Sequence, residues 1–523
     1  MNRNRLDRTA LLLITALFFG AALRFYPAVS HGFPLNDGGM FHTMIRDLKA
    51  GDYALPQFTT YNHANIPFAY PPLGFYFAAL LSTLLPVSEL WVLLYIPALI
   101  STISILVFYK FAEETLNLRM SAALAVLIFA LSPRSFLWQV MGGGITRSFG
   151  MLFLLLFLYK AMQLFKSYKH RELILAVLFG AGAVLSHPQT ALHAALGGAL
   201  IFIFYGFNKR GFISAFFTGL GVALLTVPWW LTVLTHHGLH PFISAGQTSQ
   251  RTLESYLRIL HFNGPGDYLF LPVLSLAFVG ILSSLKRREF FLITWIVLAF
   301  LIDPRGGDGI ALLALSMLAG GGLLKLSTWI SRSDGMQACP EFDRRVEAAF
   351  MKRGIQILLL GLVLYFVLSA SILDFQLVNT SLKTDDLAMI EWVNKNVEKD
   401  KTFLLATGRE FSMSDPLQEW FPALTGQYSV TTMQGLEWTL GEKFFPWYGE
   451  LIAFQYCGDL ACVNAWSTRN GVDYDYLIVM IPAENDRSLF GNSLRSLGVS
   501  VRRSAIHMLV YESEKALVFE LNK

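Results

Sequence analysis

The chain has 523 residues, of which 54% are hydrophobic and 15% charged, and its mean hydropathy is +0.48. Soluble globular proteins carry about 25% charged residues, so this composition excludes a soluble globule and indicates an integral membrane protein. The net charge of +4 reflects 41 basic and 37 acidic residues, and the excess of basic residues lies within 1–374. Such an excess beside apolar segments encodes membrane orientation, and nothing in the sequence indicates nucleic-acid binding.

Twelve apolar segments predict α-helices that cross the membrane, since a helix needs about 20 mostly apolar residues to do so. The first segment follows three arginines and has small residues, Ala28 and Ser30, at its end, as a cleaved signal peptide would. Its length and the late Arg24 favour a retained signal anchor with a cytoplasmic N-terminus. The twelve segments are 10–27, 68–85, 90–109, 120–132, 147–165, 173–186, 190–207, 212–234, 268–285, 290–303, 309–326 and 354–374.

Basic loops predict which side of the membrane each connection faces. They place the loops around 160–171, 209–210, 286–288 and 331–353 in the cytoplasm, and the first loop (28–67) and the C-terminal segment outside. Twelve crossings cannot join a cytoplasmic N-terminus to an outward C-terminus. We therefore expect 11 or 13 transmembrane helices, with one element between 68 and 207 miscounted. The short segment 173–186 is the main candidate for a helix that only half-penetrates.

The chain divides into a transmembrane domain, 1–374, and an extracytoplasmic domain, 375–523. The second part is long enough to bury its own core and reads as a small α/β domain. It has predicted helices at 386–393 and 486–497 and predicted strands at 402–406, 476–480 and 507–511.

The first outward loop holds the most informative residues. A helix near residues 40–48 would place five apolar side chains on one face, which fits an interfacial helix with its apolar side in the lipid. Asp37 precedes this helix, where a carboxylate can serve as an N-cap. Gly51 and Asp52 follow, and Tyr70-Pro71-Pro72-Leu73 opens the second apolar segment.

This order of features resembles the GT-C superfamily of polytopic glycosyltransferases. It is most similar to the branch of protein mannosyltransferases and aminoarabinose transferases, which take sugar from a polyprenyl-phosphate carrier. The resemblance implies that the first-loop acid, Asp37, is catalytic. Many relatives have Asp-Glu at this position, whereas this chain has Asp37-Gly38. That departure leaves open a second carboxylate and, with it, a divalent metal ion; no other cofactor is expected.

The oligosaccharyltransferase branch carries a Trp-Trp-Asp motif after a similar Trp-containing helix. No such motif follows Trp392, which argues against transfer of preassembled glycans to asparagine.

The implied reaction needs a base for the acceptor and positive charge for the leaving phosphate. We expect Asp37 to be the base of a single displacement that inverts the anomeric carbon. Arg147 and Arg305 are the main candidates for the phosphate, with Arg251 and Arg258 behind them; each is alternatively an interfacial anchor or the partner of a nearby acid. Further candidates for substrate binding are Tyr70 and His187, the latter alternatively a structural hydrogen-bonding residue.

Other polar clusters carry weaker signals. Three loop histidines at 236, 237 and 240 have no matching carboxylate, so a solvated loop is favoured over a metal site. The patches Glu419-Trp420-Phe421-Pro422 and Glu437-Trp438 either contact acceptor or sugar or are ordinary core and surface residues. Cys457 and Cys462 are predicted to form a disulfide that pins a local turn, because an outward domain is in an oxidising compartment. Two separate thiols are the alternative.

The sequence thus predicts a glycosyltransferase of the cell membrane. Its partners would be a polyprenyl-phosphate sugar, membrane lipids, and a lipid, glycan or protein acceptor. A transporter or flippase for a lipid-linked saccharide also fits a dozen helices, although the paired broken helices typical of transporters are missing from the sequence pattern. A GT-C-like binding module without catalysis is a third reading.

Overall fold

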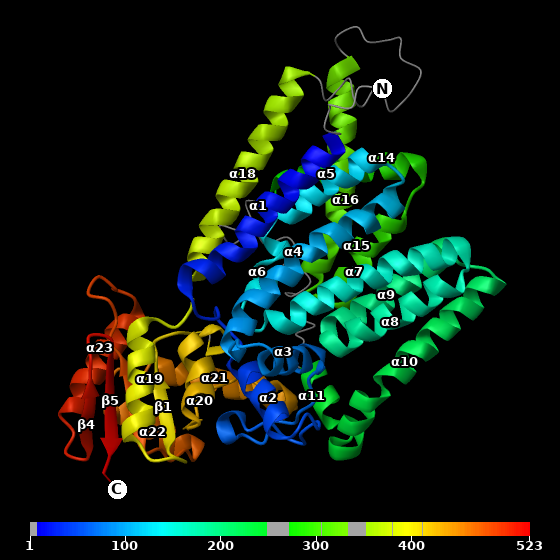
Figure 1. The fold of residues 1–523 in the computed structure, drawn as a ribbon. Helices are drawn as coiled ribbons and strands as arrows, with labels where there is room; N and C mark the ends of the chain where they lie inside the picture. Colours follow the sequence, from blue (N-terminus) through cyan, green and yellow to red (C-terminus); the bar gives the residue numbers. More distant parts are fainter. Residues whose placement is uncertain are drawn as a thin grey trace.

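The computed structural model describes residues 8–247, 271–304, 306–332, 352–378, 380–410 and 412–522. A bundle of long helices makes up the N-terminal part, and a smaller α/β domain packs against one end of it (Figure 1). We call this end of the bundle the domain end and the other the opposite end.

Within the described residues, eleven helices run lengthwise through the bundle. Seven of the described helices are long and apolar enough to cross a membrane: α1, α4, α7, α9, α10, α16 and α18. The bounds of all eleven are α1 (Arg8–His31), α4 (Glu89–Leu116), α5 (Arg119–Leu131), α7 (Gly144–Ser167), α8 (His170–Ser186), α9 (Pro188–Tyr205), α10 (Lys209–His237), α14 (Leu271–Arg287), α15 (Phe291–Ile302), α16 (Gly307–Arg332) and α18 (Arg353–Val378).

The twelfth predicted segment, α3 (Leu73–Leu84), does not run along the bundle. Its first turn lies against the start of α7, where a Cβ at Gly74 would be 3.1 Å from the carbonyl oxygen of Ile145. Near its last turn, Thr83 Oγ1 accepts a hydrogen bond of 2.7 Å from Tyr53. Both ends of α3 therefore lie at the domain end. Its residues Phe75, Ala78 and Ala79 are buried, whereas Phe77, Leu80 and Leu84 are exposed. The expected number of 11 or 13 transmembrane helices stays a prediction, since seven of the described helices are long and apolar enough to cross a membrane.

The segment 173–186 lies in α8, which runs along α7: Glu172 pairs with Lys160 at 2.9 Å at the opposite end, and His187 packs on Gly150 near the domain end. α8 has 17 residues and is not one of the described helices that are long and apolar enough to cross a membrane. Its half-penetration therefore stays a prediction.

The described basic loops gather at the opposite end. Asn208 donates a hydrogen bond of 2.6 Å to Tyr168, and the ring of Tyr205 packs edge-on against Phe291, so the connections after α7, α9 and α14 lie together. This grouping is the one that the charge pattern predicts. The basic loop at 333–351 lies outside the described residues.

The first loop forms α2 (Gly39–Ala50) beside α3. The five apolar residues predicted to face lipid are at most 4% exposed, because α3 and a helix of the C-terminal domain cover them. The expectation that this face lies in the lipid is therefore wrong. The five residues are Met40, Phe41, Met44, Ile45 and Leu48.

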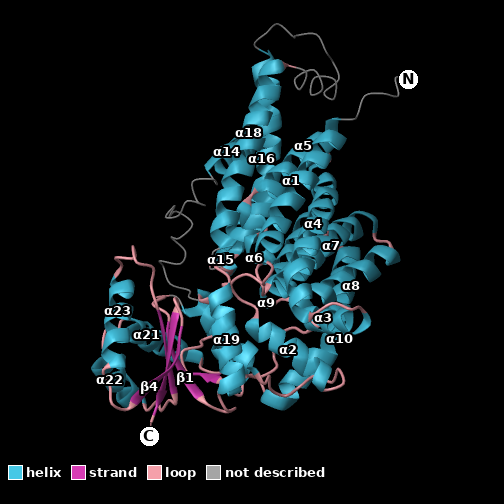
Figure 2. Ribbon diagram, turned by 60° about the vertical axis from the view of Figure 1, so that its left-hand side comes forward, coloured by secondary structure: helices cyan, strands magenta, loops and turns pink. Residues whose placement is uncertain are grey.

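The C-terminal domain has a five-stranded sheet in the order β2-β1-β3-β5-β4. Strands β1 to β3 pair in parallel and β5 runs antiparallel to β3 and β4. Figure 2 shows α22 and α23 on one side of the sheet and α19 on the other. The bounds are β1 (Thr402–Ala406), β2 (Tyr428–Ser429), β3 (Tyr476–Met480), β4 (His507–Glu512), β5 (Ala516–Leu521), α19 (Thr384–Asn396), α20 (Pro416–Thr425), α21 (Phe444–Gln455), α22 (Leu460–Asn470) and α23 (Leu489–Arg502).

Three predicted strands coincide with β1, β3 and most of β4, and the two predicted helices lie within or overlap α19 and α23. The short β2 and the last strand, β5, were not predicted. The sulfur atoms of Cys457 and Cys462 are bonded at 1.98 Å, which joins the end of α21 to the start of α22.

Candidate functional site

Asp37 lies in the loop between α1 and α2, at the domain end, and is 6% exposed. Its Oδ1 accepts a hydrogen bond of 2.9 Å from the backbone N–H of Gly143, and its Oδ2 lies 2.7 Å from Nη2 of Arg147. The N-cap of α2 is Gly38, and Asp37 makes no capping bond to that helix. The alternative role of Asp37 as the N-cap is therefore wrong, and its carboxylate is directed to the first turn of α7.

Glycines before and within the start of α7 make this approach possible. A Cβ at Gly142 would lie 1.8 Å from the carbonyl oxygen of Asp37, and a Cβ at Gly143 would lie 2.7 Å from Asp37 Oδ2. Only glycine lets the two backbones come this close. The N–H of Gly142 also donates to the carbonyl of Leu35 at 2.8 Å. Gly142 and Gly143 thus form a glycine cradle for the Asp37 loop.

Arg147 projects from the first turn of α7 and is held on two sides. Besides its pair with Asp37, its guanidinium lies 5.3 Å from the ring centre of Trp138 and donates a long hydrogen bond of 3.4 Å to the carbonyl of that residue. The side chain of Arg147 is 25% exposed, compared with 8% for Asp37. The arginine is therefore the partner that a ligand can reach.

Tyr70 and His187 lie beside this pair. The Tyr70 ring packs edge-on against His187 at 5.9 Å and against Trp438 of the C-terminal domain at 5.7 Å. Burial raises the pKa of Tyr70 to about 12, so its hydroxyl stays protonated at neutral pH and lies 3.5 Å from Thr146 Oγ1. His187 caps α9 by accepting a hydrogen bond of 3.2 Å from the N–H of Gln189.

The C-terminal domain contributes a second buried carboxylate that the sequence did not single out as catalytic. Oε1 of Glu419, on α20, accepts hydrogen bonds of 3.1 Å from the N–H groups of both Gly38 and Met40. Burial, and next the charge of Asp37, raise the pKa of Glu419 to about 8. The Glu419-Trp420 patch was visible in the sequence, but its distance from Asp37 along the chain hid the contact.

The remaining candidates lie elsewhere. Arg305, Arg251 and Arg258 fall outside the described residues. Asp303 accepts from Gln189 at 2.5 Å and lies 3.2 Å from His193 Nε2. His237 Nε2 lies 2.8 Å from the carbonyl oxygen of Gln57.

A divalent metal ion does not fit the donor set around Asp37. Mg²⁺ and Ca²⁺ need several oxygen ligands, whereas both Asp37 oxygens already face N–H donors, one of them cationic. Oε1 of Glu419 likewise already accepts hydrogen bonds from two backbone amides. Across the part of the chain that the structure describes, no three His, Cys, Asp or Glu residues are grouped to hold a metal ion.

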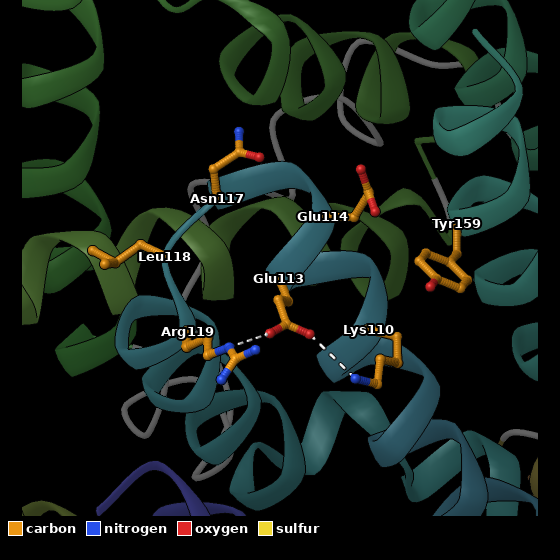
Figure 3. Close-up of a pocket in the computed structure, with 7 residues that line it drawn as sticks. All are labelled: Lys110, Glu113, Glu114, Asn117, Leu118, Arg119 and Tyr159. Atoms are coloured by element: carbon orange, nitrogen blue, oxygen red, sulfur yellow. Dashed lines mark hydrogen bonds and ion pairs between the residues drawn. The ribbon is translucent and has the colours of Figure 1, made fainter. Parts of the chain in front are cut away.

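A polar cavity of about 310 Å³ lies at the opposite end of the bundle (Figure 3). Its central carboxylate, Glu113, is already paired with Lys110 at 3.2 Å and Arg119 at 3.1 Å. Its neighbour Glu114 pairs with Lys166 at 2.7 Å. The cavity is separated from Asp37 by the length of α4, and it is not part of the candidate site.

This architecture is found in solved membrane glycosyltransferases. The chain is similar to ArnT from Cupriavidus metallidurans bound to undecaprenyl phosphate, with a TM-score of 0.57, 14% identity and coverage of 97% of both chains. It is also similar to the oligosaccharyltransferase AglB from Archaeoglobus fulgidus in complex with an inhibitory peptide and a dolichol-phosphate, with a TM-score of 0.56, 12% identity and coverage of 99% of this chain and 74% of that chain.

A third similar structure is the arabinofuranosyltransferase AftD from Mycobacteria, with a TM-score of 0.57, 15% identity and coverage of 99% of this chain and 40% of that chain. The protein is thus a multi-pass membrane protein with the fold of the GT-C superfamily, which confirms the fold class predicted from the sequence.

Part of the chain also matches a known protein family in sequence. Residues 69–234 match the family described as dolichyl-phosphate-mannose-protein mannosyltransferase. The matched region contains Tyr70, the glycine cradle, Arg147 and His187, but not Asp37 or Glu419. Among curated protein sequences, none matches the chain significantly.

Proposed function

We propose that this protein is a glycosyltransferase that moves a sugar from a polyprenyl-phosphate carrier to an acceptor, with Asp37 as the base. The observation that supports the proposal most is the pairing of a buried carboxylate with a partly exposed arginine, at 2.7 Å, in a GT-C fold. ArnT and AglB carry polyprenyl phosphates in their solved structures, which supports the carrier class.

In this proposal Asp37 and Arg147 have separate roles in a single displacement reaction. Asp37 takes the proton of the acceptor O–H or N–H group while that atom attacks the anomeric carbon. The bond from that carbon to the phosphate oxygen breaks, and its electron pair leaves with the polyprenyl phosphate. The configuration of the anomeric carbon is therefore inverted once. Arg147 stabilises the charge that develops on the phosphate.

Arg147 has enough N–H donors to bind both the Asp37 carboxylate and the phosphate of the sugar donor. A guanidinium carries five N–H donors, of which Asp37 and the Trp138 carbonyl use two. The partly exposed edge is free to take a phosphate in the fork geometry that suits it. An arriving phosphate also competes with Asp37 for the arginine, which leaves the carboxylate more basic when the donor is bound.

The charges of the loops indicate on which side of the membrane the proposed reaction occurs. The basic loops of the opposite end predict a cytoplasmic position, so the domain end with Asp37 and the C-terminal domain is extracytoplasmic in this proposal. The acceptor is then a lipid, glycan or protein group outside the cytoplasm. In this proposal the rings of Tyr70 and Trp438, which pack against each other, contact the sugar.

The test is sugar transfer by the purified protein in detergent. Synthetic polyprenyl-phosphate donors carrying mannose, aminoarabinose or arabinofuranose are supplied together with lipid, glycan or protein acceptors, and both the glycosylated acceptor and the released polyprenyl phosphate are measured by mass spectrometry. We expect release with one of these donors, and a loss of about 10²–10⁴-fold in Asp37→Asn, the usual size of a base contribution. Asp52→Asn, which changes an exposed first-loop carboxylate, is the matched control and should keep the wild-type rate. Wild-type activity in Asp37→Asn would rule out Asp37 as the base.

A further inference from the structure

The C-terminal domain touches the Asp37 loop through one short helix. α20 begins at Pro416, and its N-cap, Asp415, accepts a hydrogen bond of 3.0 Å from the N–H of Leu417. Within the same helix, Glu419 and Trp420 are 4% and 0% exposed, and they face the start of α2. The direction of α20 therefore decides what lies against the candidate base.

Consecutive residues of α20 hold the peptide bonds on both sides of Asp37. The Trp420 indole N–H donates to the carbonyl of Asn36 at 3.0 Å, and that carbonyl belongs to the peptide before Asp37. Glu419 Oε1 accepts from the N–H of Gly38 at 3.1 Å, and that amide belongs to the peptide after Asp37. The carbonyl of Glu419 accepts a further hydrogen bond of 2.7 Å from Tyr61, which fixes the α20 backbone itself.

Glu419 also replaces a cap that α2 cannot provide. The first amides of an α-helix have no partner within the helix, and the N-cap here is a glycine without a side chain. Glu419 satisfies the N-cap amide and the amide of Met40 together. The capping group of the helix thus comes from another domain.

The backbone geometry leaves no room for a local substitute. Gly38 has a φ of +125°, and a Cβ there would lie 2.7 Å from the carbonyl carbon of Gly142. A Cβ at Gly39 would lie 2.4 Å from the carbonyl oxygen of Glu419. A side chain at position 38 would therefore clash with Gly142, and the carboxyl group that caps α2 comes from residue 419 instead.

We propose that Glu419 is a positioning residue for the transfer reaction: from the C-terminal domain it holds the first turn of α2 so that Asp37 faces Gly143 and Arg147. The inference rests on the proposed function, because it assigns Asp37 the role of base. Glu419 acts through Asp37 and takes no proton from the substrate.

The charge state of Glu419 fits this role. With a pKa of about 8, its carboxyl carries a proton at neutral pH, so it accepts both amide hydrogens without placing a second negative charge beside Asp37. A protonated carboxyl and a carboxamide present the same carbonyl oxygen. Glutamine is therefore expected to replace this residue, whereas alanine leaves two amides at the start of α2 without their acceptor.

The experiment compares Glu419→Gln, Glu419→Ala and the control Glu442→Ala, which changes an exposed residue of the same domain. In the full-length protein we expect Glu419→Ala to lower kcat by about 10–100-fold, since a misplacement of about 1 Å can cost about 100-fold, with KM for the donor within about threefold. Glu419→Gln and the control should stay within about threefold of the wild-type kcat. Trp420→Phe removes only the bond to Asn36, and we expect a smaller loss of kcat.

A second readout does not depend on activity. Amide hydrogen exchange of the peptide covering residues 36–45, followed by mass spectrometry, should be faster in Glu419→Ala and unchanged in Glu419→Gln. Exchange unchanged in Glu419→Ala would overturn the inference even if the wild type transfers no sugar, in which case the proposed function fails separately. An inactive Glu419→Gln with wild-type exchange would also overturn it, because the residue would then act as a proton donor or acceptor. If Glu419→Ala does not fold, Trp420→Phe and Glu419→Gln still decide between these outcomes.

Discussion

Both ends of the helical bundle hold pairs of a carboxylate and a cation, but the pairs differ in how deeply they are buried. At the opposite end, Glu113 pairs with Lys110 and Arg119, whose side chains are 58% and 78% exposed. At the domain end, the Asp37–Arg147 pair is covered by α2, α7 and the C-terminal domain. Exposed pairs contribute about 0–1 kcal/mol, whereas removing one partner of a buried pair costs about 3–5 kcal/mol. Burial, rather than the presence of charge, distinguishes the candidate site.

The strongest test of this comparison removes one arginine from each end. We expect Arg147→Gln to lower transfer by at least about 100-fold, as the loss of one charge-stabilising donor does. It should also destabilise the protein by about 3 kcal/mol, because Asp37 is left buried without its partner. Rates and thermal unfolding in detergent measure both effects.

Arg119→Gln is the matched control at the opposite end, and it should change neither quantity beyond about 1 kcal/mol or its equivalent in rate. Equal effects of the two substitutions would contradict the distinction between the ends.

A smaller effect is expected from pH. The pKa of Glu419 is raised from an ordinary value near 4.5 to about 8, so the folded protein holds a proton that the unfolded chain releases. The stability that this group contributes is fully present below about pH 4.5 and is lost as the pH rises through about 8. The charged or titratable groups that face it are Asp37, Glu437, Tyr61 and Arg147.

We therefore expect the unfolding temperature of the wild type to fall between pH 5 and pH 8 more steeply than that of Glu419→Gln. Glu113→Gln, at the opposite end, should keep the wild-type slope. Parallel curves for wild type and Glu419→Gln would show that Glu419 is ionised in the folded protein throughout this range.

The smallest effect should come from the cavity at the opposite end. A double-mutant cycle of Glu113→Gln and Arg119→Gln, measured by thermal unfolding, should give a coupling of at most about 1 kcal/mol that disappears in high salt. Transfer should be unchanged in all three variants. A loss of transfer in Glu113→Gln would connect this cavity to the reaction and break the comparison.

Much of the fold was predictable because lipid exposure and sheet burial leave periodic signals. Eleven of the twelve apolar segments are lengthwise helices, and β1 and β3 were found at their observed bounds. The clearest failure concerns α2. Its apolar residues were expected to face lipid, but they are buried against other parts of the protein, including a helix of the C-terminal domain that is distant in the sequence.

The candidate site was predictable where a single residue and its neighbours carry the signal. Asp37 and Arg147 were both predicted as candidate site residues. Their direct contact was not predicted, because no local pattern links residues 110 positions apart. Glu419 escaped for the same reason: its importance comes from two backbone amides of a glycine-led helix, and a hydrogen bond to a backbone leaves little trace in sequence.

The contact between α20 and the start of α2 joins segments that are synthesised at different times. The ribosome makes Asp37 early and Glu419 only 382 residues later. The candidate base is therefore made before the group that holds it, and the described helices of the bundle have all been made before α20 appears. A nascent chain that stops short of α20 carries Asp37 without its contacts to Glu419 and Trp420, so in the proposed mechanism its transfer rate stays reduced until the C-terminal domain has folded.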